Sequence, residues 1–259
     1  WYFAEEMSLN TQKPYAERCY PPVKIQKLVE PISCEKVEDS FVYDFGFNKV
    51  TGVDFSADQS GIILAPKYVK NTDLARISFG QSIAVTPLQL LTAACSVING
   101  GNLYQPYFVQ SISDDHGKTL VENKPVVVKQ VISEKTSALM RSMLESVVKE
   151  GGGKNASVEG YKVGGKTGTA QKYRDGVIVQ GVHVGSFFGF APADDPKIAI
   201  LVTVDEAQMY NDYGSVTAAP YAGQILQKML NPVTLLLPMK TLDAVHQGNR
   251  LLLPLKLQG

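Results

Sequence analysis

The sequence has few of the side chains that build disulfides and metal centres. Its 259 residues include three cysteines, Cys19, Cys34 and Cys95, an odd number without C-x-x-C spacing, which argues against a disulfide framework and a structural zinc site. Its three histidines are expected in a turn, a strand and the tail: His116, His183 and His246. We therefore predict no metal and no cofactor. A Ser-His-Asp arrangement lacks support, and His183 is expected as a surface or cross-strand residue.

The chain also lacks a charge excess and long apolar runs. Its 25 basic and 25 acidic side chains cancel, so nothing points to nucleic acid or an anionic membrane surface as the partner. The leucine-rich stretch after residue 231 is interrupted by prolines and is too short to span a membrane. With no recognisable signal peptide or anchor, we expect a membrane anchor to lie upstream of this sequence.

The most informative segment is Tyr161–Gln171, which fits two unrelated signatures. From Gly160 it fits G-x-x-x-x-G-K-T, a phosphate-binding loop, and from Lys166 it fits K-T-G-T, typical of penicillin-recognising acyl transferases. A phosphate loop must follow a strand and open a helix. Here turn-forming residues precede the run, and an Asp-Gly turn at residues 175–176 follows too soon for a helix.

The following strands argue against a nucleotide hydrolase as well. An apolar strand ending in Asp205 resembles the magnesium-binding partner of a phosphate loop. However, three expected strands, Val177–Val184, Ser186–Ala191 and Lys197–Val204, are joined by only a few residues. Parallel strands need a crossover of a dozen or more residues, so we predict an antiparallel meander and regard a P-loop NTPase as the least favoured alternative.

As a strand, the Lys-Thr-Gly run would alternate its side chains between two faces. Lys166 and Gly168 would share one face, and Thr167 and Thr169 the other. The glycines leave room for an extended peptide to lie alongside an exposed strand edge. The alternative is a solvated strand lysine beside a glycine bulge.

The remaining pattern predicts an α+β domain, with a mainly antiparallel sheet flanked by helices. Thr86, Pro87 and Gln89 form a helix start with a capping box. Leu88, Leu91, Cys95 and Ile98 mark its buried stripe, and Gly100 ends it. Strands are expected at 107–113 and 126–132, with a turn at 114–117. Ser133 should cap a second helix, with Leu139, Met143 or Leu144, and Val147 inward, and a last helix should cover about 218–230.

Several motifs in order resemble the transpeptidase domain of class B penicillin-binding proteins, of the division and sporulation type. These motifs are Phe45–Asp54 (FGF and TGVD), Ser78–Leu90 (GQS and VTPLQ), Asn99–Tyr107, Val163–Gln171 and Ser186–Pro192. The resemblance runs from about residue 41 to about residue 230. It implies a β-lactamase/transpeptidase-like fold with an incomplete helical subdomain.

The resemblance also implies a peptidoglycan D,D-transpeptidase with an acyl-enzyme on serine. Lys166 would supply positive charge beside that serine. Thr167, Gly168 and Thr169 would bind the substrate, and the Thr169 N–H would form half of the oxyanion hole. The implied partners are D-Ala-D-Ala stem peptides, β-lactams and the division or sporulation machinery. The implied location is the cell envelope, on the extracytoplasmic face of the cytoplasmic membrane.

The nucleophile does not stand where the family pattern puts it. Glu30–Lys36 resembles the family's E-P-G-S-x-x-K, with Ser33 as nucleophile and Lys36 as base, but residues 35–44 fit equally well the helix that leads into the FGF loop. The formal S-x-N at Ser8–Asn10 precedes Ser33, although it should follow it. We therefore expect the C-terminal portion of a transpeptidase domain at 35–231, without the helical part that carries the family's serine, lysine and S-x-N and thus inactive as given, with an unassigned segment at 1–34 and an irregular tail at 232–259. A β-lactamase or D,D-carboxypeptidase, and a non-catalytic scaffold, remain alternatives.

Overall fold

The computed structural model describes residues 42–65, 68, 73, 76–77, 80–175 and 177–230. The chain divides into two compact units, Trp1–Ser137 and Ala138–Gly259. Ser33, Lys36 and the formal S-x-N lie outside the described residues, as do the whole of segments 1–34 and 232–259. Among the described helices, none combines the length and apolar character needed to cross a membrane.

Helix α4, Pro87–Ile98, begins where the sequence predicts. Thr86 is its N-cap, its hydroxyl accepts from Gln89 N at 3.1 Å, and Gln89 Oε1 accepts from Thr86 N at 2.8 Å. These two reciprocal bonds satisfy N–H groups that a helix start otherwise leaves unpaired. The helix ends at Asn99, and Gly100 and Gly101 both have positive φ angles, as predicted for a glycine stop.

The predicted buried stripe of α4 is confirmed only at Ile98, which is fully buried. Leu88, Leu91 and Cys95 are half-buried, whereas Gln89, Ala93 and Ser96 are buried on neighbouring turns. These positions lie at steps of four and three residues, so they share one side of the helix. Small side chains let the backbone approach its neighbours closely, and the two polar groups are buried because each has hydrogen-bond partners.

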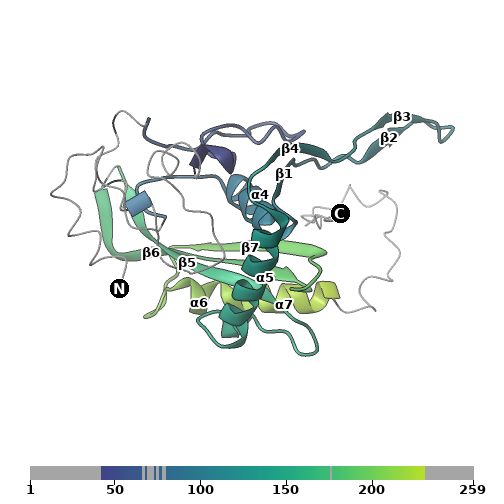
Figure 1. The fold of residues 1–259 in the computed structure, drawn as a ribbon. Coiled ribbons are helices and arrows are strands. Elements are labelled where there is room, and N and C mark those ends of the chain that lie inside the picture. The colour runs from purple at the N-terminus through teal and green to yellow at the C-terminus, as the bar shows by residue number, and fades with distance from the viewer. Residues whose placement is uncertain are drawn as a thin grey trace. The chain divides into compact units, whose positions relative to one another are not determined.

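Two short antiparallel ladders follow α4. Strand β1, Asn102–Gln105, pairs with β4, Val126–Gln130, and strand β2, Ser111–Ser113, pairs with β3, Thr119–Glu122. The β2–β3 hairpin extends away from the β1–β4 pair (Figure 1). The turn at 114–117 is confirmed, since Gly117 N donates to Asp114 O. The predicted strand at 107–113 is correct only for its last three residues, and β1 and β3 were missed.

Helix α5, Glu134–Lys149, is capped by Ser133, whose hydroxyl accepts from Thr136 N at 3.1 Å. On its predicted inward face Leu144 is half-buried and Met143 is exposed, which resolves that choice in favour of Leu144. The glycine-rich segment after α5 leads into a short 3-10 helix, η3, Lys154–Ala156. The segment before the Lys-Thr-Gly run is therefore not a strand, as expected.

The second unit contains a three-stranded antiparallel sheet. Strands β5, Gly164–Arg174, β6, Val177–Ala191, and β7, Ile198–Asp205, pair in the order β5-β6-β7. The antiparallel meander is thus confirmed, but the two strands predicted within 177–191 are one continuous strand. Gly185 does not interrupt it, because this residue pairs with Thr169 on one side and Val204 on the other.

Helices α6, Gly214–Thr217, and α7, Ala219–Leu230, lie on one face of this sheet (Figure 1). The last helix therefore matches its predicted range and position. The core between α7 and the sheet is centred on Phe187 and Leu226, both fully buried, with Ala218, Ala219 and Ala222. The small alanines and Gly223 allow the helix backbone to lie close to its neighbours.

Candidate active site

Strand β5 forms an edge of the three-stranded sheet within the described residues. Lys166 pairs with Phe188, and Thr167 pairs with Phe187. Since Phe187 belongs to the core beneath α7, Thr167 and Thr169 lie on the helix-covered face, and Lys166 and Gly168 lie on the opposite face. The predicted alternation is confirmed. The phosphate-loop alternative is excluded, since the motif lies inside a strand and runs into a hairpin.

Two glycines ahead of Lys166 are required by the aromatic side chains of β6. A Cβ atom on Gly164 would lie closer than 3.0 Å to the Phe190 ring, and one on Gly165 equally close to the Phe187 ring and the Phe188 carbonyl. Both glycines are buried. The Gly-Gly that precedes Lys166 therefore leaves the space that the β6 aromatic rings occupy beside β5.

The Lys166 side chain is exposed. Its ammonium donates to the carbonyl of Thr167 at 2.9 Å and lies 3.4 Å from the Thr167 hydroxyl. No carboxylate of the described residues forms an ion pair with it. This is unlike other lysines of the same unit: Lys162 pairs with Asp194, and Lys172 pairs with Asp205. The positive charge of Lys166 is thus available to an anionic ligand at the strand edge.

The hydroxyl of Thr169 has a defined partner. Its Oγ1 accepts a hydrogen bond from the backbone N–H of Gly214, the first residue of α6, at 3.1 Å. A hydroxyl can accept and donate at once. The hydrogen of Thr169 therefore remains available for an acceptor while its oxygen is held in place.

A histidine and aspartate pair lies close to this contact, and no sequence motif indicates it. The carboxylate of Asp212 lies 2.8 and 2.9 Å from His183 Nδ1 and accepts from His183 N at 3.0 Å. Burial raises the pKa of the Asp212 carboxyl, but the hydrogen bonds and the charge of His183 outweigh it and hold the pKa below its usual value. Tyr213 packs edge-on against the imidazole, with ring centroids 5.8 Å apart.

Asp205, the residue that resembled a magnesium ligand, serves instead as an ion-pair partner. Its carboxylate lies 2.6 Å from Lys172 Nζ, and Glu206 bridges Lys172 and Arg174. The hydrogen bond that Lys172 donates to Asp205, together with the charges of both carboxylates, raises the pKa of Lys172. These charges link the hairpin end of β5 to the end of β7. Across the described chain, no three His, Cys, Asp or Glu side chains gather in a way that could hold a metal ion.

Two of the other family-like motifs have structural roles in the first unit. Asp54, which ends the TGVD segment, accepts from the backbone N–H groups of Phe108 and Val109 at 2.6 and 2.9 Å. These two bonds lower the pKa of its carboxyl. In the Asn99–Asn102 segment, a Cβ on Gly101 would collide with the carbonyl of Ile132. Sequence alone suggested a family for these residues but not these contacts.

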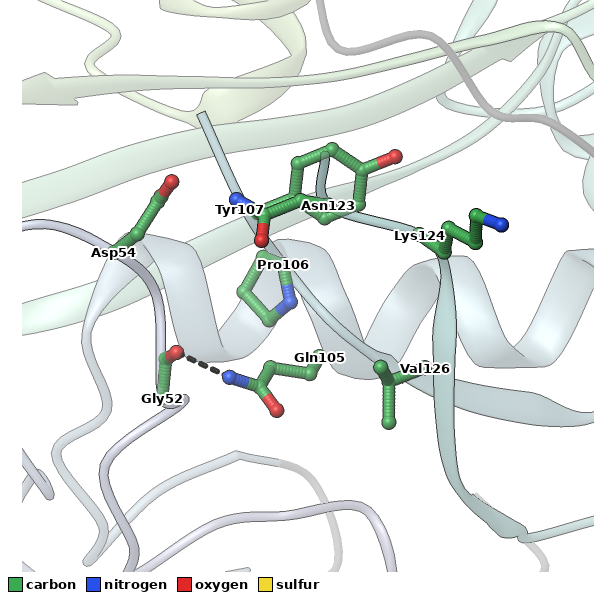
Figure 2. Close-up of a pocket in the computed structure, with 8 residues that line it drawn as sticks. All are labelled: Gly52, Asp54, Gln105, Pro106, Tyr107, Asn123, Lys124 and Val126. Carbon is green, nitrogen blue, oxygen red and sulfur yellow. Dashed lines mark hydrogen bonds between the residues drawn. The ribbon is translucent and has the colours of Figure 1, made fainter. Parts of the chain in front are cut away.

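A small cavity of about 100 Å³ lies beside these contacts, and Figure 2 shows the side chains that line it. Two of its lining residues are joined by a hydrogen bond, which Gln105 Nε2 donates to the Gly52 carbonyl at 2.6 Å. The lining residues are Gly52, Asp54, Gln105, Pro106, Tyr107, Asn123, Lys124 and Val126. They include no serine, cysteine or histidine, and Asp54 is already bonded to backbone. This cavity lacks the groups that acyl transfer needs.

An antiparallel sheet backed by a C-terminal helix, with a Lys-Thr-Gly strand at its edge, defines the class of penicillin-recognising α+β proteins. The family model described as the penicillin binding protein transpeptidase domain matches residues 25–227, and the chain belongs to this family. The fold class predicted from the sequence is confirmed.

Curated relatives carry the same family signature. The chain is 45% identical over 191 residues to stage V sporulation protein D of Bacillus subtilis, covering 73% of this chain and 30% of the relative. It is 30% identical over 210 residues to the probable peptidoglycan D,D-transpeptidase PenA of Neisseria gonorrhoeae, covering 81% and 34%. The chain thus spans about a third of the length of these two relatives.

Solved structures agree with the fold. Penicillin-binding protein 3 of Mycobacterium tuberculosis, in complex with ampicillin, matches with a TM-score of 0.67 and 28% identity, covering 73% of this chain and 44% of that one. The transpeptidase domain of penicillin-binding protein 3 from Burkholderia pseudomallei matches with a TM-score of 0.62 and 28% identity, covering 73% and 55%.

Proposed function

We propose that this chain is part of a peptidoglycan D,D-transpeptidase, which cross-links stem peptides through an acyl-enzyme on serine and binds β-lactams. The observation that carries the proposal is the β5 edge, where an exposed ammonium without a described carboxylate partner stands beside glycines and a held threonine hydroxyl. Family membership and the names of the relatives point to the same reaction.

In this reaction a stem peptide lies along β5 as an added strand. A serine oxygen attacks the carbonyl of the penultimate D-alanine, and the terminal D-alanine leaves with a proton. An amine from a neighbouring peptide then attacks the ester, and the serine is regenerated. Lys166 supplies positive charge near the reacting groups, Thr167 and Thr169 bind the terminal carboxylate, and Gly168 leaves space for the peptide. The Thr169 N–H stabilises the developing oxyanion.

For the nucleophile, the sequence offers Ser33, with Lys36 as its base. The transpeptidase domain is proposed to occupy residues 35–231, between the segments 1–34 and 232–259. The place of action is the outer face of the cytoplasmic membrane, within the division or sporulation machinery. The identity to a sporulation protein supports this setting.

Labelling with a fluorescent penicillin tests the proposal. We expect one adduct on a serine, competed by an acyl-D-Ala-D-Ala peptide, and mass mapping identifies that serine. Lys166→Ala should reduce labelling by about tenfold or more, since one charge-assisted contact contributes at least this much. Lys162→Ala is the matched control, because Lys162 is also exposed in the same unit but is paired with Asp194.

Four results would contradict the proposal in different ways. A folded wild-type chain that takes no penicillin would favour either a transpeptidase portion without its nucleophile or a non-catalytic scaffold. Rapid release of hydrolysed penicillin would favour a β-lactamase, and release of D-alanine without cross-linking a carboxypeptidase. Equal labelling of Lys166→Ala and Lys162→Ala would remove Lys166 from the site.

A further inference from the structure

We propose that His183 and Asp212 form a positioning pair, which holds residues 212–214 against the sheet so that Gly214 orients the Thr169 hydroxyl toward a ligand carboxylate. The proposal rests on the proposed function for the ligand. The positioning itself rests on contacts within the second unit. His183 pairs with Gln171 of β5, but neither His183 nor Asp212 bonds to the Thr169 hydroxyl, so their effect on that hydroxyl is transmitted through Gly214.

The pair is built to fix one short segment. Asp212 is 8% exposed, and its carboxylate takes both the ring N–H and the backbone N–H of His183. Because a carboxylate only accepts, His183 Nδ1 must carry a hydrogen. The Asp212 carbonyl is within 3.4 Å of the Thr217 hydroxyl, which also donates to Tyr213 O at 3.0 Å. The segment is therefore attached to β6 at one end and to α6 at the other.

Residues 212–214 lie directly on the strand backbones. A Cβ on Gly214 would lie closer than 3.0 Å to the carbonyls of Gly168 and Ser186, and one on Gly185 closer than 3.0 Å to the Thr217 hydroxyl. Glycine at position 214 therefore allows a backbone-to-backbone approach that no larger residue permits. Movement of residues 212–214 would therefore change the backbone contact with Gly168, which lies inside the Lys-Thr-Gly run.

The bond from Gly214 N to Thr169 Oγ1 sets the direction of the threonine hydroxyl. With one lone pair of Oγ1 occupied, the hydroxyl hydrogen points away from Gly214 and is free to donate. A ligand carboxylate, which only accepts, is the complementary group. If residues 212–214 shift, Thr169 loses this partner and its hydroxyl can rotate, which weakens a donor that was held in place before binding.

Hydrogen exchange measured residue by residue tests the positioning. We expect His183→Ala to accelerate exchange of the Gly214 amide by about tenfold, the loss expected for a hydrogen bond to a charged group. His183→Asn should restore most of the protection, because its side-chain N–H reaches the position of Nδ1. His116→Ala, which removes a histidine from an exposed turn in the other unit, is the matched control and should change nothing at Gly214.

Penicillin binding tests the consequence. In the same variants we expect His183→Ala to weaken the first, reversible binding step by several-fold while the acylation rate constant changes little, and His183→Asn to recover both. Unchanged Gly214 exchange in His183→Ala, or no recovery in His183→Asn, would overturn the positioning role. If the wild-type chain binds no penicillin, the proposed function fails and the carboxylate part of this proposal fails with it. The exchange comparison then still decides the positioning part.

Discussion

Replacement of Gln89 by leucine should destabilise the first unit, although leucine is a good helix former. The Gln89 side chain is 2% exposed and makes three hydrogen bonds. Its Nε2 donates to the carbonyls of Lys49 and Ser60 at 2.7 and 3.0 Å, and its Oε1 accepts from Thr86 N at 2.8 Å. One residue thus closes the cap of α4 and holds the loop that contains the FGF and TGVD motifs.

The expected loss follows from these three bonds. Each contributes about 0.5 to 1.5 kcal/mol net, so Gln89→Leu should lower the free energy of unfolding by about 1.5 to 4.5 kcal/mol. Leucine offers no partner to the two carbonyls or to the cap N–H. Helix propensity acts in the opposite direction but is small, since leucine and glutamine differ by only about 0.2 kcal/mol in a helix.

Urea unfolding followed by circular dichroism, with amide exchange of α4 as a local probe, measures this loss. Gln227→Leu in α7 is the matched control, because Gln227 is exposed on its helix and its replacement should change stability by less than about 0.5 kcal/mol. If Gln89→Leu is as stable as the wild type, the hydrogen bonds of Gln89 contribute nothing net and the argument is refuted.

Three further predictions follow from the same contacts. Gly165→Ala should lower the free energy of unfolding in urea by about 1 to 3 kcal/mol, because its methyl meets the Phe187 ring and the Phe188 carbonyl. In Gly168→Ala the methyl meets only the rotatable Ser186 hydroxyl, so this variant should lose penicillin labelling with little loss of stability. A larger loss of stability in Gly168→Ala than in Gly165→Ala would contradict the packing. Burial raises the pKa of the Cys95 thiol to about 12, so alkylation at pH 8 should be roughly a thousandfold slower in folded than in urea-unfolded protein, and equal rates would show an accessible thiolate. The folded-state pKa of Asp54 is lowered, so the stabilising effect of this carboxylate is complete above its unfolded pKa of about 3.9 and is lost as the pH falls through the folded-state pKa. Exchange of the Phe108 and Val109 amides should therefore accelerate below the folded-state pKa in the wild type but not in Asp54→Asn.

The sequence predicted the features that depend on neighbours along the chain. The capping box at Thr86 and Gln89, the glycine stop at Gly100 and the cap at Ser133 involve residues a few positions apart, and all are confirmed. The alternation of Lys166 and Thr167 also follows from strand geometry alone. These signals are local, so a single sequence contains them in full.

Features set by distant contacts could not be predicted. The buried face of α4 is decided by what Gln89 bonds to some 30 and 40 residues earlier, and not by its leucines. The pairing of His183 with Asp212 joins two residues 29 positions apart, with no motif to mark it. Gly185 suggested a break between two strands, but its missing side chain makes room for Thr217 and for Gly214 of α6.

The β5–β6 hairpin has a consequence for the order in which the protein folds. Its two strands are joined through residues 175 and 176 and pair up to Gly164 and Phe190, with one register shift between Gln171 and Tyr173, so its closest contacts need almost no loop closure. Hairpins of this kind form in about 1 to 10 μs. The bulky rings of Phe187 and Phe190 fit only under glycines, which disfavours shifted pairings as the strands meet. During synthesis on the ribosome, the strand that carries Lys166 can therefore reach its final pairing before α7 has been made.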